Sequence, residues 1–266
     1  MTDNTVNQND VQQNAPLATH IYTADPSAHV FNGKLYIYPS HDLGNDSPDD
    51  GSGDHFWMED YHVFSLDSID GPLTDHGEAL HVKDVPWASE QMWAPDANTK
   101  NGKYYFYFPA KDKDGIFRIG AAVADQPEGP FTAEPDYIQG SFSIDPAVFV
   151  DDDGTAYLYA GGLWGGQLEK WQTGEYVANP EAGTQGADGP QGDAPALAPW
   201  VAPLNEDMVS LAAEPRYVEI LDENGAPITA GDLDRRFFEA AWIHKFDNGK
   251  YYLSYSTGDT HFLCYA

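Results

Sequence analysis

The chain has 266 residues, of which 13 are basic and 43 are acidic, so its formal net charge is −30 at pH 7. Such a charge repels nucleic acid phosphates and anionic membranes, so neither is an expected partner, and a neutral or cationic ligand is favoured. The single cysteine, Cys264, excludes an intramolecular disulfide and a cysteine-based zinc site.

Residues 1–16 form a polar segment rich in Asn and Gln. They have neither a basic n-region nor an apolar h-region, so we expect a disordered tail and not a signal peptide. No stretch of the sequence is long and apolar enough to cross a bilayer. We therefore expect a cytoplasmic protein, with secretion by another route left open, in which residues 17–266 form one domain.

Four segments along the chain share a pattern: an acidic residue, a few apolar residues, a tight turn and an aromatic strand. They begin at Asp25 (DPSAHVFNGKLYIY), Asp96 (DANTKNGKYYFYF), Asp145 (DPAVFVDDDGTAYLYAG) and Glu239 (EAAWIHKFDNGKYYLSYSTG). An Asn-Gly or Asp-Gly pair between alternating apolar runs is typical of a β-hairpin, because both residue types tolerate positive φ. Four similar hairpins predict four similar sheets.

The four turn glycines are far enough apart for a four-stranded sheet and its loops, whereas Gly and Pro interrupt nearly every window that could hold a helix. We therefore predict an all-β propeller in which the first strand of each blade carries its acidic residue to the central axis. A β-sandwich is the alternative.

Two segments are expected to be loops. Residues 42–60 are acidic and Gly-rich and contain an aromatic pair, which is typical of a loop at the rim of a site. Residues 172–206 are rich in Gly, Pro and Ala and predict a long surface excursion. The sequence stops at HFLCYA inside an expected strand, so we expect a truncated chain with an unfinished last blade.

Three of the many carboxylates differ in context from the rest. Asp25, Asp145 and Glu239 lie at the edges of apolar strands, in IYTADPSAHV, SFSIDPAVFV and RRFFEAAWIH, whereas most acidic residues are solvated surface groups. The proline after each Asp is expected to hold it extended and to fix the direction of its carboxylate, although Asp-Pro is equally consistent with a simple strand start. Asp96 follows its proline, and we expect it to cap a turn.

The aromatic residues Phe237, Phe238 and Trp242 predict an apolar pocket around Glu239, which would raise its pKa. An ionised Asp145 nearby would raise that pKa further. The alternative is that Glu239 is a buried structural carboxylate paired with one of the two arginines that precede it.

Such a set of carboxyl groups suits the hydrolysis of a glycosidic bond, which needs one acid to protonate the leaving oxygen and one carboxylate to act on water or sugar. Glu239 is the candidate acid. Asp25, if hydrated, would stay ionised and could draw a proton from water.

The segments 19–108, 141–164 and 236–261 resemble glycoside hydrolase family 43, through motifs such as ADPSAHVFNGKLYIYPSHD, MWAPDANTKNGKYYFYF and FFEAAWIHKFDNGKYYLSYSTGDTH in this order. The resemblance implies a five-bladed β-propeller, of which the last part is missing from this chain. It also implies that Asp25 is the general base, Asp145 the pKa modulator and Glu239 the general acid, with inversion at the anomeric carbon.

The resemblance further implies a glycosidase that removes terminal xylose, or secondly arabinofuranose, from xylan- or arabinoxylan-derived oligosaccharides, since FFEAAW and STGDTH resemble a β-xylosidase branch. Trp93 is expected either to stack on a sugar face or to be ordinary blade core. The competing functions are a non-catalytic carbohydrate-binding propeller and an inactive fragment.

One metal is implied and no organic cofactor. His261, in GDTH, resembles a central-channel histidine that helps to hold a structural Ca²⁺ through waters, and a core histidine without metal is the alternative. The DDDG sequence at residues 151–154 resembles part of a calcium loop but lacks its downstream Glu, so we expect a hairpin turn there.

Overall fold

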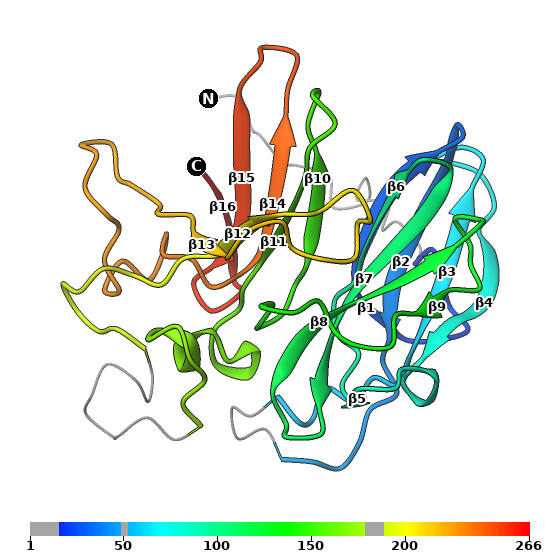
Figure 1. Ribbon diagram of the computed structural model, residues 1–266, viewed down its shortest axis with the longest axis horizontal. Helices are drawn as coiled ribbons and strands as arrows, with labels where there is room; N and C mark the ends of the chain where they lie inside the picture. Colours follow the sequence, from blue (N-terminus) through cyan, green and yellow to red (C-terminus); the bar gives the residue numbers. More distant parts are fainter. Residues whose placement is uncertain (1–15, 49–52, 179–188) are drawn as a thin grey trace, which may run out of the picture.

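The computed structural model describes residues 16–48, 53–178 and 189–266. In these residues, four antiparallel sheets are arranged around a common axis as the blades of a propeller (Figure 1). Residues 1–15, where the tail was predicted, lie outside the described part. The prediction of an all-β propeller is confirmed, whereas the described residues form four blades and the predicted count of five is not confirmed.

The strands follow the chain from blade to blade. Blade 1 contains β1 (Thr23–Phe31), β2 (Lys34–His41), β3 (Asp60–Leu66) and β4 (Thr74–His81). Blade 2 contains β5 (Ala88–Glu90), β6 (Asp96–Lys100), β7 (Lys103–Asp112), β8 (Phe117–Ala124) and β9 (Thr132–Ala133). Blade 3 contains β10 (Ala147–Val150), β11 (Ala156–Ala160), β12 (Trp200–Pro203) and β13 (Arg216–Tyr217). Blade 4 contains β14 (Glu239–Lys245), β15 (Tyr251–Thr257) and β16 (Phe262–Tyr265).

All four predicted hairpins are present, and each begins with the innermost strand of its blade. The turn glycines Gly33, Gly102, Gly154 and Gly249 have φ of 78°, 77°, 83° and 75°, which a residue with a Cβ rarely adopts. At the DDDG sequence, the N–H of Gly154 donates to the carbonyl of Asp151 at 2.9 Å, so this segment is the predicted hairpin turn.

The inner strands form a continuous series in which β1 contacts β6, β6 contacts β10 and β10 contacts β14. Asp25 lies near the start of β1, Asp145 lies just before β10, and Glu239 is the first residue of β14. Because inner strands start at the same end of a propeller axis, this arrangement brings the three side chains to one mouth.

Aromatic side chains fill the spaces between blades. In β7, Phe106 and Phe108 pack with blade 1, whereas Tyr105 and Tyr107, one position out of step, pack with blade 3. This follows from the period of two along a strand, which sends alternate side chains to opposite faces. Burying each such ring stabilises the fold by about 2–3 kcal/mol before entropic costs.

The loop predicted for residues 172–206 is wrong at its C-terminal end, because residues 200–203 form β12 and Trp200 is fully buried. The strand has only four residues, too few to show periodicity beside Gly- and Pro-rich sequence. Within the same predicted loop, residues 179–188 lie outside the described part.

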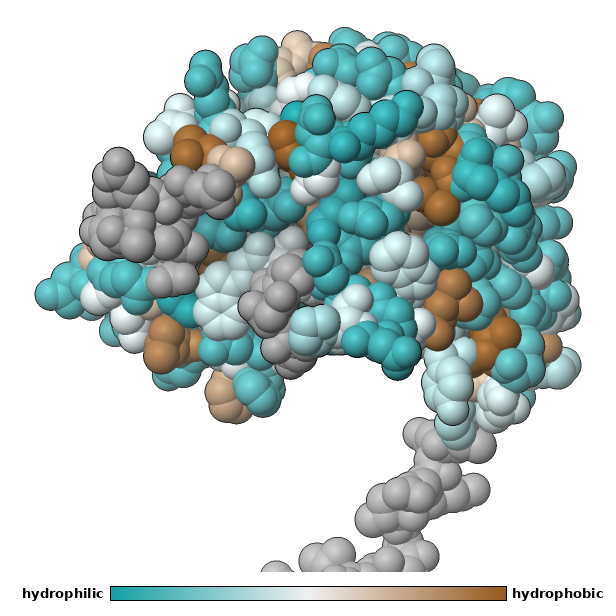
Figure 2. Space-filling model, turned by 90° about the horizontal axis from the view of Figure 1, so that it is seen from below, coloured by the Kyte–Doolittle hydropathy of each residue, from teal (hydrophilic) through white to brown (hydrophobic). Residues whose placement is uncertain are grey.

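Helical structure in the described residues is limited to three 3₁₀ turns, η1 (Val82–Asp84), η2 (Trp164–Gly166) and η3 (Leu168–Trp171). None of the helices described is long and apolar enough to span a bilayer. Hydrophilic residues cover most of the face seen in Figure 2, and hydrophobic residues appear there only in small, separate groups.

Candidate active site

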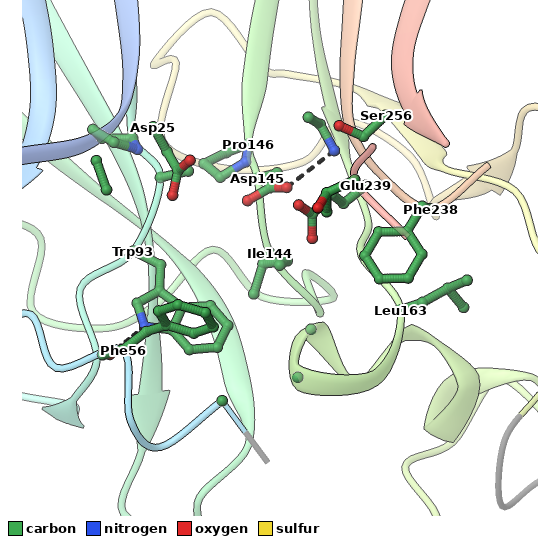
Figure 3. Close-up of a pocket in the computed structure, with 18 of the residues that line it drawn as sticks. Asp25, Phe56, Trp93, Ile144, Asp145, Pro146, Leu163, Phe238, Glu239 and Ser256 are labelled. Atoms are coloured by element: carbon green, nitrogen blue, oxygen red, sulfur yellow. Dashed lines mark hydrogen bonds between the residues drawn. The ribbon is translucent and has the colours of Figure 1, made fainter. Parts of the chain in front are cut away.

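A cavity of about 760 Å³ opens where the inner strands begin, and residues of all four blades line it. Asp25, Asp145 and Glu239 all lie in its wall, so the structure brings the three predicted carboxylates together (Figure 3). In this view Asp145 lies beside Glu239, while Asp25 extends from the opposite side.

The backbone at the two aspartates differs from the prediction. Asp25 and Asp145 have φ of 46° and 57°, so neither is held in the extended conformation that the following proline was expected to impose. Asp accepts the left-handed region more readily than most residues. At Asp25 a bulge also shifts the pairing of β1 with β2 between Ala24 and Ser27, which turns the side chain out of the regular alternation of the strand.

A second bulge occurs at Glu239, where the pairing of β14 with β15 shifts between Glu239 and Trp242. Ala240, inside this bulge, has φ of 59°. Its N–H points at the neighbouring blade and donates to Oδ2 of Asp145 at 3.0 Å. The left-handed conformation of an alanine costs about 1–2 kcal/mol, and here it fixes Asp145 relative to Glu239.

The pKa of each carboxyl in this pair is raised. Burial raises the pKa of Asp145 well above its ordinary value, and the charges of Glu239 and Asp25 raise it further. Burial, followed by the charge of Asp25, raises the pKa of Glu239 to about 7, as the apolar setting predicted. Two carboxyls that repel one another titrate as a unit, so the pair holds a proton near neutral pH.

The hydrogen bond from Ala240 acts on only one of the two carboxyls. It opposes the rise in the pKa of Asp145, because a donor stabilises the ionised carboxylate. No hydrogen bond to the Glu239 carboxyl is found among the described residues. The two carboxyls thus differ in their surroundings, since only Asp145 accepts this hydrogen bond among the described residues.

Asp25 is the most exposed of the three carboxylates and is open to water in the cavity. The surrounding protein still raises its pKa by burial, and the charge of Asp42 raises it further. Sequence reasoning missed Asp42, which also lines the cavity. Its position, next to the end of β2 in a segment expected at the rim of a site, was the available signal.

The apolar wall around Glu239 agrees only in part with the prediction. Phe238 and Trp242 line the cavity, but Phe237 is 1% exposed and packs in the core, with its ring 5.9 Å from that of Tyr255. Both phenylalanines precede β14, and Phe238 is buried as well, at 6% exposure.

The alternative in which Glu239 is paired with a preceding arginine is wrong. Arg235 pairs with Asp232 at 3.0 Å, and Arg236 pairs with Asp259 at 3.5 Å. Glu239 is thus left next to acidic groups, where its pKa rises.

Trp93 packs as blade core and also lines the cavity, and its stacking on a sugar stays a prediction. It is 8% exposed, its ring centroid lies 4.6 Å from that of Phe117, and its Nε1–H donates to the carbonyl of Phe56 at 2.9 Å. It nevertheless forms part of the cavity wall together with Phe56 (Figure 3). Phe56 belongs to the segment predicted at the rim of a site, and this expectation is confirmed for the described residues of that segment.

Asp96 does not cap a turn as predicted. It is fully buried, its Oδ1 lies 2.6 Å from Nε2 of His29, and its Oδ2 accepts from the N–H of Val148 at 2.7 Å. It therefore connects β6 with β1, which carries Asp25, and with β10, which begins just after Asp145.

His261 lies in the turn between β15 and β16. It is exposed, so it is not a core histidine, and its Nδ1 lies 2.7 Å from the carbonyl of Gly258. It does not line the cavity, and it belongs to no group of three potential metal ligands among the described residues. A role of His261 in holding calcium through waters stays a prediction.

Comparison with known proteins gives consistent results. Residues 73–265 match the model of the family described as "Glycosyl hydrolases family 43". The chain is 64% identical over 253 residues to xylosidase/arabinosidase 43A of Humicola insolens, covering 94% of this chain and 76% of that protein. It is 55% identical to a xylosidase/arabinosidase of Bacteroides ovatus, covering 92% and 73% of the two chains.

Solved structures agree with these matches. A β-xylosidase/α-arabinofuranosidase from a compost metagenome, in complex with xylotriose in a calcium-free form, superposes with a TM-score of 0.89 and 61% identity, over 95% of this chain and 75% of that one. An enzyme from Xanthomonas citri in complex with xylose gives a TM-score of 0.85 and 58% identity, over 95% and 71%.

Proposed function

The chain belongs to glycosyl hydrolase family 43, and we propose that it hydrolyses glycosidic bonds with Glu239 as general acid, Asp25 as general base and Asp145 as modulator of the Glu239 pKa. The observation that carries this proposal is the pair of Asp145 and Glu239, which holds a proton in the same cavity that exposes Asp25 to water.

Glu239 supplies the proton that the leaving oxygen needs. Because its pKa is raised to about 7, a large share of the molecules carry this proton near neutral pH, and the group is acidic enough to release it in the transition state. Asp145, held by the Ala240 N–H at 3.0 Å, lies beside Glu239 and is the group that we assign as modulator of its pKa.

Asp25 acts on water from the other side of the cavity. It is exposed, and in Figure 3 its carboxylate extends from a different blade from those that carry Asp145 and Glu239. A base on the face opposite the acid directs water to the anomeric carbon as the leaving group departs, and this geometry gives inversion of configuration.

The substrate is a terminal xylose or arabinofuranose unit of a xylan- or arabinoxylan-derived oligosaccharide. Relatives that share 64% and 55% of their residues with this chain are named xylosidase/arabinosidase, and the compost-metagenome enzyme binds xylotriose. We place β-xylosidase activity first, because a protein that is 50% identical over 92% of this chain is named β-xylosidase. The raised Glu239 pKa disfavours a non-catalytic binding propeller, which has no use for a carboxyl held protonated.

The test compares Asp25→Ala and Glu239→Ala on aryl xylosides and arabinofuranosides, with Asp247→Asn, an exposed turn residue of blade 4, as control. The hydrolysis rate of each alanine variant on nitrophenyl substrates should fall roughly 10²–10⁴-fold. A dinitrophenyl leaving group needs no proton, so it should restore the rate of Glu239→Ala and not that of Asp25→Ala. Equal restoration in both variants would refute the assignment of roles, and NMR of the first product would show whether configuration inverts.

A further inference from the structure

A cluster of potential metal ligands lies in blade 1, apart from the three cavity carboxylates. It consists of His41, the last residue of β2, together with Asp60 and His62 of β3. Asp60 and His62 are two positions apart, so they project to the same side of their strand. Each side chain is at least four-fifths buried, with side-chain exposures of 20%, 9% and 15%.

The ligand atoms of these three residues converge. Nδ1 of His41 lies 2.9 Å from Oδ1 and 3.2 Å from Oδ2 of Asp60, and Nε2 of His62 lies 3.6 Å from Oδ2 of the same carboxylate. One atom from each residue lies within 4.8 Å of the other two. In a tetrahedral site with bonds of about 2.0–2.2 Å, ligand atoms are separated by roughly 3.3–3.5 Å, so small side-chain shifts would suffice.

A second carboxylate orients His62. Oδ1 of Asp75 lies 3.0 Å from Nδ1 of His62, and Asp75 is itself held by Nε2 of His20 at 2.6 Å and by the N–H of Gly77 at 2.8 Å. A carboxylate that accepts from Nδ1–H of His62 leaves the Nε2 lone pair facing Asp60, 3.6 Å away, as in carboxylate–histidine–metal arrangements.

We propose that Nδ1 of His41, Nε2 of His62 and the carboxylate of Asp60 bind a divalent transition-metal ion, with zinc as the best fit and Asp75 as the residue that positions His62. Two imidazole nitrogens and one carboxylate are borderline ligands that suit zinc, whereas calcium and magnesium prefer shells made of oxygen. The remaining coordination position would be taken by water.

The place of this cluster in the chain gives the ion a structural effect. His41 and Asp60 stand at the two ends of the segment that contributes Asp42, Phe56 and other residues to the cavity wall. An ion held by both residues would tie the end of β2 to the start of β3, next to Asp42. The metal-ligand cluster is thus separate from the three cavity carboxylates, but it adjoins a segment that lines the cavity.

The test measures zinc itself. Metal-free protein is dialysed against zinc with excess magnesium, which occupies weak carboxylate sites on this acidic surface, and bound zinc per chain is counted by atomic absorption. We expect His41→Gln and His62→Gln each to bind one equivalent less than the wild type. His244→Gln, which changes a histidine of blade 4 outside the cluster, should bind as the wild type does.

Isosteric changes provide a second measurement that preserves packing. Asp60→Asn should lose the zinc equivalent bound at the cluster. Asp75→Asn should still bind this zinc, with affinity lowered about 10–100-fold, because the substitution removes only the group that orients His62. Cobalt added to the wild type should give visible bands of a four- or five-coordinate ion, absent in Asp60→Asn. Equal zinc content in wild type and in the folded ligand variants, or identical cobalt spectra in wild type and Asp60→Asn, would overturn the proposal.

Discussion

The N–H of Ala240 donates to Oδ2 of Asp145 at 3.0 Å, across the boundary between blades 3 and 4. The donor belongs to the residue that follows Glu239, so one backbone group fixes the position of the Asp145 carboxyl relative to Glu239. The same hydrogen bond favours the ionised form of Asp145. Its direction depends on the left-handed φ of 59° at Ala240. The position of the Asp145 carboxyl beside Glu239 therefore depends on the backbone of β14.

The Glu239→Gln variant should gain stability with rising pH relative to the wild type. The folded-state pKa of Glu239 is raised from 4.5 to about 7, so its contribution to stability is fully present below pH 4.5 and is lost as pH rises through about 7. Glutamine has no proton to lose. The gain should reach at most about 3 kcal/mol above pH 7, measured by urea unfolding at several pH values.

A difference between Glu239→Gln and wild type that does not change with pH would contradict the raised pKa. The exposed variant Asp247→Asn controls for the loss of one negative charge from a strongly acidic chain.

The Asp42→Asn variant should move the acid limb of the kcat/KM pH profile to lower pH. The charge of Asp42 raises the pKa of Asp25, so removing it lets Asp25 ionise at lower pH. Asp46→Asn changes an exposed carboxylate of the same segment and should leave the limb in place. If both variants shift the acid limb equally, the general surface charge, and not Asp42 in particular, raises the pKa of Asp25.

The Asp96→Asn variant should lose about 1–3 kcal/mol of stability, because one amide cannot replace two carboxylate oxygens that serve His29 and Val148 in a fully buried position. We expect kcat to fall as well, since β1 and β10 hold Asp25 and Asp145. Asp125→Asn, which breaks an exposed ion pair with Lys103, should cost measurably less stability, because solvent screens exposed charges. Thermal unfolding measures the stability of both variants, and steady-state kinetics measures their kcat. Equal losses of stability in Asp96→Asn and Asp125→Asn would refute the role of Asp96 in connecting the three strands.

The Gly53→Ala variant should weaken substrate binding through Trp93. Gly53 has φ of 80°, and a Cβ there would lie 2.5 Å from Cη2 of Trp93. Gly33→Ala is the matched control, because φ is 78° and nothing lies within 4 Å. Both variants bear a backbone cost of about 1–2 kcal/mol, but only Gly53→Ala should raise KM and shift tryptophan fluorescence. An equal change in KM would mean that the Trp93 ring does not contact the sugar.

Local features of the sequence predicted the repeated unit of the fold. An Asn-Gly or Asp-Gly pair defines a hairpin through the φ of two residues, and alternation in YYFYF defines two buried faces, so hairpins and four sheets could be predicted before any tertiary contact was known. The strand β12 was missed because it has only four residues and pairs with β11, more than forty residues earlier.

Context also singled out Asp25, Asp145 and Glu239, because apolar neighbours distinguish them from solvated acids. Their conformations followed from the tertiary structure. Asp25 and Asp145 are left-handed and not extended, since bulges and contacts between blades outweigh the preference that a following proline imposes.

The sequence by itself determined the hairpins, the alternating core faces and the identity of the cavity carboxylates, because each depends on residues adjacent in the chain. Only the tertiary structure decided that the Asp145 carboxylate accepts from the Ala240 N–H, that Asp96 connects three strands, and that Asp42 acts on Asp25. These properties arise from groups that are distant in sequence, such as Asp145 and Ala240, separated by 95 positions. Electrostatic and hydrogen-bond energies depend on distance in space, which folding alone establishes.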